Sequence, residues 1–250
     1  MLPSKVWVEL GGLRLGDLNH SAIDAALDRL RGPTTVEDRL QVLERLVNYW
    51  HGEIRPEDGF RDDELRDLPM PPPLRWWYRW AGRRQNIMSG QNTLLDPGDL
   101  EVKDDLLVFY GENQWCYEWG TPLHGDDPPV SGRCESVDPW VPEGMVLSEH
   151  LILACLFEAI FHSPYGASVT LIYCSSLDLI VDTITPISIE PWRWGGEGRF
   201  YAKAGAFMIT MQNYQVDGKW FYSAWIGAKT EHPLQFLKPY IDGSWEYVAI

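Results

Sequence analysis

The sequence has no apolar run long enough to cross a bilayer. Its most apolar stretch, residues 151–161, contains Glu158 and is soon followed by Pro164, whereas a membrane-spanning helix needs about 20 largely apolar residues. Residues 1–7 also lack the long apolar stretch of a signal peptide. Together these two absences predict a cytoplasmic protein that does not enter a membrane.

Cysteine is scarce and shows no motif. The chain has 4 cysteines, which are widely separated and include no Cys-x-x-Cys pair. This spacing argues against a zinc knuckle and against a redox motif, and it predicts free buried thiols in a reducing compartment. The cysteines are Cys116, Cys134, Cys155 and Cys174.

Basic side chains are few relative to acidic ones. The chain has 21 Lys and Arg against 36 Asp and Glu, which gives a net charge of −15. This charge repels phosphate backbones and anionic lipid headgroups, so direct binding to nucleic acid or to a membrane is not expected. It would speed the encounter with a basic protein, although solubility alone also explains an acidic surface.

Motifs for catalysis and cofactor binding are missing. The glycine-rich segment 195–198 carries Glu197 where a phosphate would approach, and no Gly-x-Ser-x-Gly element occurs. Glu158 and His162 can share a helix face, but two ligands without a third do not define a metal site. We therefore predict a non-enzyme that holds no cofactor and no metal. An undetected hydrolase is an alternative, because catalytic carboxylates need no local motif.

Helical patterns dominate the first third of the chain. Thr34 to Glu37 form a candidate capping box before apolar residues at three- and four-residue spacing, which predicts a helix ending near Gly52. A weaker helix is expected over residues 21–30 and a short one over 74–80. We predict an N-terminal helical extension, residues 1–55, packed on an α+β domain of residues 56–250.

Strand patterns follow from residue 100 onward. Residues 106–110 and 115–119 predict a hairpin with Trp115, Tyr117 and Trp119 on one face. A proline- and glycine-rich stretch, 121–144, is expected to be loose, and residues 149–161 predict a helix buried on more than one side. Further strands are expected within 179–189, over 201–212 and over 220–228, with a short helix after Pro233. Most of the 13 tryptophans are expected in the core.

Four segments in order resemble the SUKH superfamily, which includes bacterial immunity proteins and a yeast cell-wall assembly regulator. They read LPMPPPLRWWYRWAG (68–82), LLVFYGENQWCYEWG (106–120), DDPPV (126–130) and LSEHLILACLFEAIF (147–161). The resemblance covers about residues 68–240. It implies an α+β fold with a central, largely antiparallel sheet flanked by helices, and it implies binding rather than catalysis. In bacterial members the bound partner is a toxin, often a nuclease.

An immunity-type protein that neutralises a basic toxin domain by stoichiometric binding is the function that we predict. A regulatory or scaffold protein is an alternative, in which the first sixty residues supply an additional docking surface. The candidate partner-binding residues are the acidic loop residues, the hairpin turn and one aromatic side chain: Asp62, Asp63, Glu64, Asp104, Asp105, Glu112, Asn113, Gln114, Trp119, Asp126 and Asp127.

Overall fold

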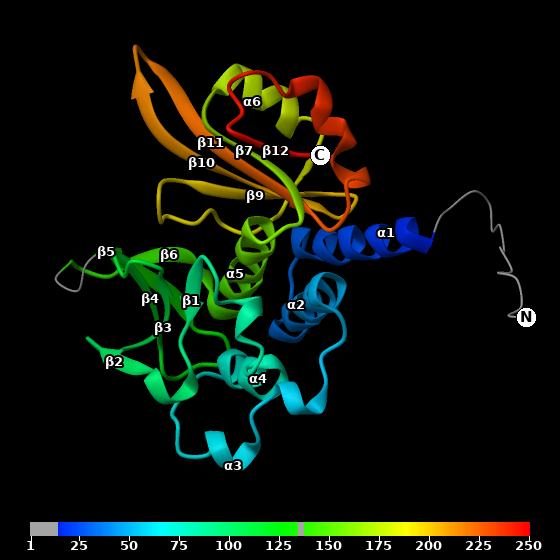
Figure 1. Cartoon of the computed structure of the whole chain (residues 1–250). Helices are drawn as coiled ribbons and strands as arrows, with labels where there is room; N and C mark the ends of the chain where they lie inside the picture. Colours follow the sequence, from blue (N-terminus) through cyan, green and yellow to red (C-terminus); the bar gives the residue numbers. More distant parts are fainter. Residues whose placement is uncertain (1–14, 135–137) are drawn as a thin grey trace, which may run out of the picture.

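One helix lies at the centre of the molecule, between two antiparallel sheets (Figure 1). The computed structural model describes residues 15–134 and 138–250. The expected α+β class is confirmed, and the strands are divided between two sheets that share the central helix α5 (Leu147–Phe161). None of the helices in these two ranges is both long and apolar enough to span a membrane.

Sheet A has the strand order β1-β3-β4-β5-β6, with β2 paired to the same strand β3 as β1. The expected hairpin is confirmed as β3 and β4, in which Leu106 pairs with Pro122 and Gly111 with Glu118. The strands are β1 (Asn92–Leu94), β2 (Glu101–Lys103), β3 (Leu106–Glu112), β4 (Tyr117–Pro122), β5 (Pro129–Cys134) and β6 (Val141–Val146).

Sheet B has the order β12-β7-β11-β10-β9-β8. Its two longest strands form the expected hairpin through Asp217 and Gly218, whose φ angles of 49° and 76° suit a tight two-residue turn. The strands are β7 (Tyr165–Tyr173), β8 (Thr185–Pro186), β9 (Gly198–Lys203), β10 (Ala206–Val216), β11 (Lys219–Ala228) and β12 (Tyr247–Ala249).

The predicted helices are present with small shifts in their ends. A capping box begins the predicted helix, but one residue later than Thr34 and Glu37, because Thr35 Oγ1 accepts the Asp38 N–H at 3.2 Å and the Asp38 carboxylate accepts the Thr35 N–H at 2.9 Å. A 3₁₀ helix over His232–Tyr240 follows Glu231. The other helices are α1 (Leu15–Asp28), α2 (Val36–His51), α3 (Asp62–Leu65), α4 (Pro72–Ala81) and α6 (Cys174–Val181).

Three strand predictions need correction. Residues 201–212 are two strands, because Ala204 and Gly205 adopt positive φ and turn the chain there. Residues 179–189 contain the end of α6 and only the short β8, since a brief apolar run does not distinguish helix from strand. The stretch 121–144 contains β5 and β6. Pro142 is tolerated because β6 lies at the edge of its sheet.

Helix α5 is apolar nearly all round, and it is buried on all sides as expected. It packs against α2, α4, β5, β6, β10 and β11. The side chains of α1 and α2 belong to the same hydrophobic cluster as α5. Deleting the N-terminal helices would therefore expose the core, whatever role they have in binding.

Polar side chains on α5 connect it to its neighbours. The buried Glu158 carboxylate accepts the backbone N–H groups of Gln91 at 2.8 Å and Asn92 at 2.7 Å, and it so fixes the start of β1. Burial raises the pKa of Glu158 and lowers the pKa of His150 to about 3. His150 is therefore neutral at pH 7, within 5.5 Å of the rings of Trp119 and Trp192.

A carboxylate in the DPPV segment joins α2 to the start of α5. Asp127 accepts the Arg39 guanidinium at 2.8 Å, the Ser148 N–H at 2.9 Å and the Ser148 hydroxyl at 2.5 Å. The Arg39 and Asp127 side chains are only 13% and 10% exposed, so loss of either leaves the other poorly solvated.

Replacing Asp127 with alanine is therefore expected to lower the free energy of unfolding by about 2–4 kcal/mol. The adjacent and exposed Asp126 is a matched control, and Asp126→Ala should change it by less than about 0.5 kcal/mol. Urea unfolding followed by tryptophan fluorescence measures both. Equal losses in the two variants would contradict this role of Asp127.

Candidate functional site

The acidic loop around α3 is largely neutralised by its own arginines. Asp62 contacts Arg79 at 2.7 Å, Asp63 contacts Arg61 at 3.1 Å, and Glu64 contacts Arg83 at 2.6 Å. Glu64 also accepts the Arg61 N–H at 2.9 Å. These three candidate residues organise their own loop, and they present little unbalanced negative charge to a partner.

Asp104 is the exposed member of an ion-pair network on sheet A whose other members, Arg133 and Glu118, are buried. Its carboxylate contacts Arg133 at 2.8 Å, and Arg133 also contacts Glu118 at 2.7 Å. The Arg133 guanidinium lies 4.2 Å from the ring centre of Trp140. Asp104 therefore has a structural partner that the sequence pattern did not reveal.

Asp105 and Asp126 are exposed, and neither has an ion-pair partner in the described parts of the chain. They belong to loops at the same end of sheet A, because β3 begins at Leu106, β4 ends at Pro122 and these two residues pair. Asp104 and Asp105 have φ angles of 50° and 67° and form the two-residue turn between β2 and β3, a left-handed conformation that aspartate accepts more readily than most residues.

The three candidate residues of the β3–β4 turn, at the opposite end of sheet A, differ in burial. Glu112 is buried and accepts the Gln114 N–H at 2.8 Å and the Cys116 thiol at 3.1 Å, so it shapes the turn. Asn113 and Gln114 are exposed. The expected common face of three aromatic residues is also corrected, because Trp115 has a φ of 59° and lies in the turn.

Trp119 is completely buried, and a partner cannot reach it in this structure. The exposed aromatic side chain of this hairpin is Trp115, which is 50% exposed. Its ring lies over Gly111, where a Cβ would come within 2.4 Å of it. The sequence prediction put Trp115 and Trp119 on one face because side chains alternate along a strand. Strand β4 begins only at Tyr117, so Trp115 belongs to the turn and does not follow that alternation.

A pocket of about 410 Å³ lies between β6 and the segment that leads into β9. Its lining includes Glu143, Glu190, Arg193 and Glu197. Glu143 is buried and accepts the Tyr117 hydroxyl at 2.8 Å and the Arg193 N–H at 3.0 Å. Burial raises the pKa of Glu143. A carboxyl group with a raised pKa keeps its proton to a higher pH than an exposed one.

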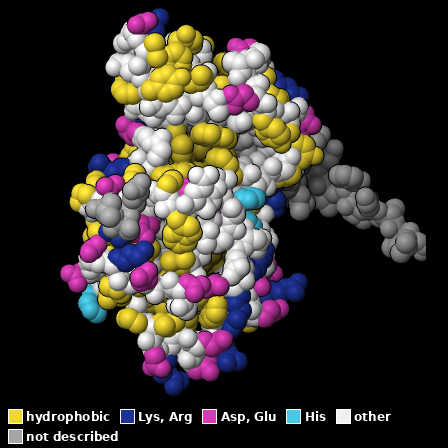
Figure 2. Space-filling view, turned by 60° about the vertical axis from the view of Figure 1, so that its left-hand side comes forward, with side chains coloured by type: hydrophobic (Ala, Val, Ile, Leu, Met, Phe, Trp, Pro, Cys, Tyr) yellow, Lys and Arg dark blue, Asp and Glu magenta, His cyan; other side chains and the backbone are white. Residues whose placement is uncertain are grey.

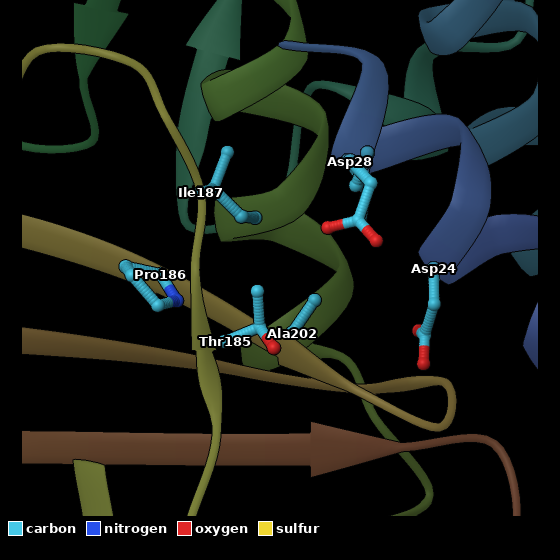
Figure 3. Close-up of a pocket in the computed structure, with 7 residues that line it drawn as sticks. Asp24, Asp28, Thr185, Pro186, Ile187 and Ala202 are labelled. Atoms are coloured by element: carbon cyan, nitrogen blue, oxygen red, sulfur yellow. The ribbon is translucent and has the colours of Figure 1, made fainter. Parts of the chain in front are cut away.

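A second pocket, of about 100 Å³, lies between α1 and the β8–β9 edge of sheet B. Figure 3 shows Asp24 and Asp28 on α1 facing Thr185, Ile187 and Ala202. Asp24 accepts the Ala204 N–H at 2.7 Å and so fixes the β9–β10 turn. This space is too small for a drug-sized ligand, which needs roughly 300 Å³ or more.

Histidines and cysteines are not grouped in the described residues. No set of three or more His, Cys, Asp or Glu side chains there could hold a metal ion. Cys155 is buried as expected, whereas Cys116, Cys134 and Cys174 are exposed. His162 lies beside Glu158 at 3.4 Å, and that pair has no third ligand within residues 15–134 and 138–250.

Charge is divided unequally along the chain. Of the 36 acidic and 21 basic side chains, 8 acidic and 6 basic ones lie in residues 165–250, and the remaining 28 and 15 precede them. Figure 2 shows acidic and basic side chains intermingled over the lower half of the molecule and a broad hydrophobic area near the top. The part that contains sheet A is therefore strongly acidic, and sheet B is nearly neutral.

Comparisons with protein families, with curated proteins and with solved structures find no match for this chain. The resemblance to the SUKH superfamily therefore stays an interpretation of the sequence.

Replacing Glu143 with glutamine should remove a pH dependence of stability. Because the pKa of Glu143 is raised in the folded state, the folded protein holds this proton more tightly than the unfolded chain. The stability that this provides is present below the unfolded pKa of about 4.3 and is lost as pH rises through the folded value. A glutamine amide can still accept the Arg193 N–H and donate to the Tyr117 hydroxyl oxygen.

Relative to wild type, Glu143→Gln should therefore gain stability as pH rises from 4 to 7, by up to about 1.4 kcal/mol per pH unit inside that window. Urea unfolding at pH 4, 5, 6 and 7 measures the difference. A constant difference between the two proteins across these pH values would contradict a raised pKa at Glu143.

Proposed function

We propose that this chain is an immunity-type binding protein that neutralises a basic toxin domain, such as a nuclease, by stoichiometric binding. The single observation that carries the proposal is the division of charge, which leaves an excess of 13 acidic side chains before Tyr165. A nuclease presents a basic, phosphate-binding surface, and an acidic protein surface competes with the nucleic acid for it. The order of the SUKH-like segments supports the same role.

The end of sheet A that carries Asp105 and Asp126 is the binding surface that we infer. Most other candidate carboxylates already contact arginines, so their charge is balanced within the chain. Asp105 and Asp126 are exposed, and no arginine or lysine within residues 15–134 and 138–250 forms an ion pair with either of them.

The paired variant Asp105→Asn/Asp126→Asn tests this surface. Asparagine has nearly the same shape as aspartate and accepts a left-handed φ, so the fold should be unchanged. We expect affinity for the toxin domain encoded beside this protein to fall about tenfold, with most of the change at low salt. Titration calorimetry at two salt concentrations measures the affinity and its dependence on salt.

The matched control is Asp178→Asn/Asp182→Asn, which removes the same charge from exposed positions on and just after α6 in the nearly neutral part. Its affinity should stay within about threefold of wild type. Equal losses in the two pairs would mean that overall charge, not this surface, governs binding. Failure of wild type to bind or neutralise the toxin would contradict the proposed function.

An undetected hydrolase is the second candidate, and the pocket lined by Glu143, Glu190 and Glu197 favours it. Most glycoside hydrolases use a pair of carboxylic acid side chains that flank the bond they cleave. A binding protein should release no nitrophenol from a panel of nitrophenyl glycosides between pH 5 and 7. Turnover that Glu143→Gln abolishes would establish the hydrolase and contradict the non-catalytic assignment.

A further inference from the structure

Helix α6 covers only part of one face of sheet B. It packs against β7 and β11 near the top of Figure 1. Beside the helix lies a pocket of about 200 Å³, whose walls come from α6 and from β9, β10 and β11. This pocket is a candidate ligand site that the sequence gave no reason to expect.

The sheet side of the pocket is formed by side chains that share one face. Thr210 on β10 pairs with Arg199 on β9, and Gln212 on β10 pairs with Tyr222 on β11. Directly paired residues lie on the same face of a sheet, and residues two apart along a strand do so as well. The same face carries Met208, which belongs to the hydrophobic cluster that includes the buried residues of α6.

Thr210 lies at the bottom of the pocket. It is only 2% exposed, and its hydroxyl forms no hydrogen bond within residues 15–134 and 138–250. Its neighbours on this face, Met208 and Ala224, are apolar and buried. Packing alone would favour valine at this position, because valine has the shape of threonine and needs no hydrogen-bond partner. The open pocket beside the hydroxyl supplies the space for such a partner.

The upper walls of the pocket combine hydrogen-bond donors with acceptors. Asp178 of α6 is exposed and accepts the Cys174 thiol at 3.6 Å, and Glu197 contacts Arg199 across the start of β9. The Gln212 amide, which can both donate and accept, has no partner in the described parts of the chain. A ligand in this pocket therefore meets both kinds of group at once.

This set of groups favours a neutral ligand that carries several hydroxyl groups. An anion would be repelled by Asp178 and Glu197, and an ammonium group, which only donates, would leave the donors of Arg199 and Gln212 unused. A hydroxyl group both donates and accepts, so it suits every polar side chain here.

The size of the pocket narrows the class further. About 200 Å³ holds roughly eight to ten non-hydrogen atoms, which corresponds to the ring of a monosaccharide. Tyr201 and Tyr222 also line the pocket, and their rings provide apolar surface for the C–H groups of a sugar.

We infer that the pocket between α6 and sheet B binds a neutral polyol of monosaccharide size, with the Thr210 hydroxyl as a hydrogen-bond partner at its base. Glu197 borders both this pocket and the one that contains Glu143, but the other lining residues differ. The inference is independent of toxin binding, because Asp105 and Asp126 lie on sheet A.

Titration of the ¹⁵N-labelled protein with D-xylose, D-ribose and D-glucose, followed by NMR, tests the inference. At least one of these sugars should cause saturable shifts at residues 199–201 and 210–212, with a dissociation constant of about 0.1–10 mM. Thr210→Val should weaken the binding of that sugar at least about fivefold, because a ligand hydroxyl then loses its partner.

The matched control is Thr185→Val on β8. Thr185 pairs with Ala202, the residue after Tyr201, so it lies on the opposite face of sheet B. Its sugar affinity should stay within about twofold of wild type. Thermal unfolding provides a second readout: Thr210→Val should keep or raise the melting temperature, since the threonine hydroxyl has no partner to lose.

Three results would overturn the inference. The first is the absence of saturable shifts in the pocket with all three sugars. The second is tighter binding of ethanolamine or inorganic phosphate there than of any sugar, since the pocket would then select a charged ligand. The third is equal sugar affinity of Thr210→Val and wild type.

Discussion

Burial of α5 on every side is the constraint on which the rest of the structure depends. A helix without a polar face needs apolar neighbours all round, and neither sheet alone can supply them. Sheet A, sheet B and the N-terminal helices therefore share one core around it. Two polar groups of α5 are held internally: Ser148 by Asp127, and Glu158 by the backbone at the start of β1.

Elements with a strong local signal could be predicted from the sequence. The turn at Asp217 and Gly218 and the apolar run of α5 each depend on neighbouring residues, and both are confirmed. The capping box of α2 was predicted one residue too early, at Thr34 and not at Thr35. The division into two sheets could not be predicted in this way. It depends on which strands pair across long separations, and short apolar strands carry no information about their partners.

The candidate site was only partly predictable for a similar reason. Sequence identifies carboxylates but not the arginines that contact them, so Asp104 with Arg133, and Asp127 with Arg39, could not be distinguished from free acids. Burial separates Glu112 and Trp119 from their exposed neighbours in the same hairpin. The Glu143 pocket had no sequence signal at all, because its walls come from segments almost fifty residues apart.

The two sheets suit different ligands. The acidic part around sheet A has charge that attracts a basic protein, while the pocket between α6 and sheet B combines hydrogen-bond donors with acceptors. We propose that these sites act separately, one toward a toxin and the other toward a small polyol.

Hydrogen exchange of the free protein and of its complex with a cognate toxin domain tests the proposed binding role most directly. We predict slower exchange in the complex at residues 104–106 and 123–127, with exchange at residues 214–221 unchanged. Protection confined to residues 214–221, or the absence of any complex, would contradict the proposal.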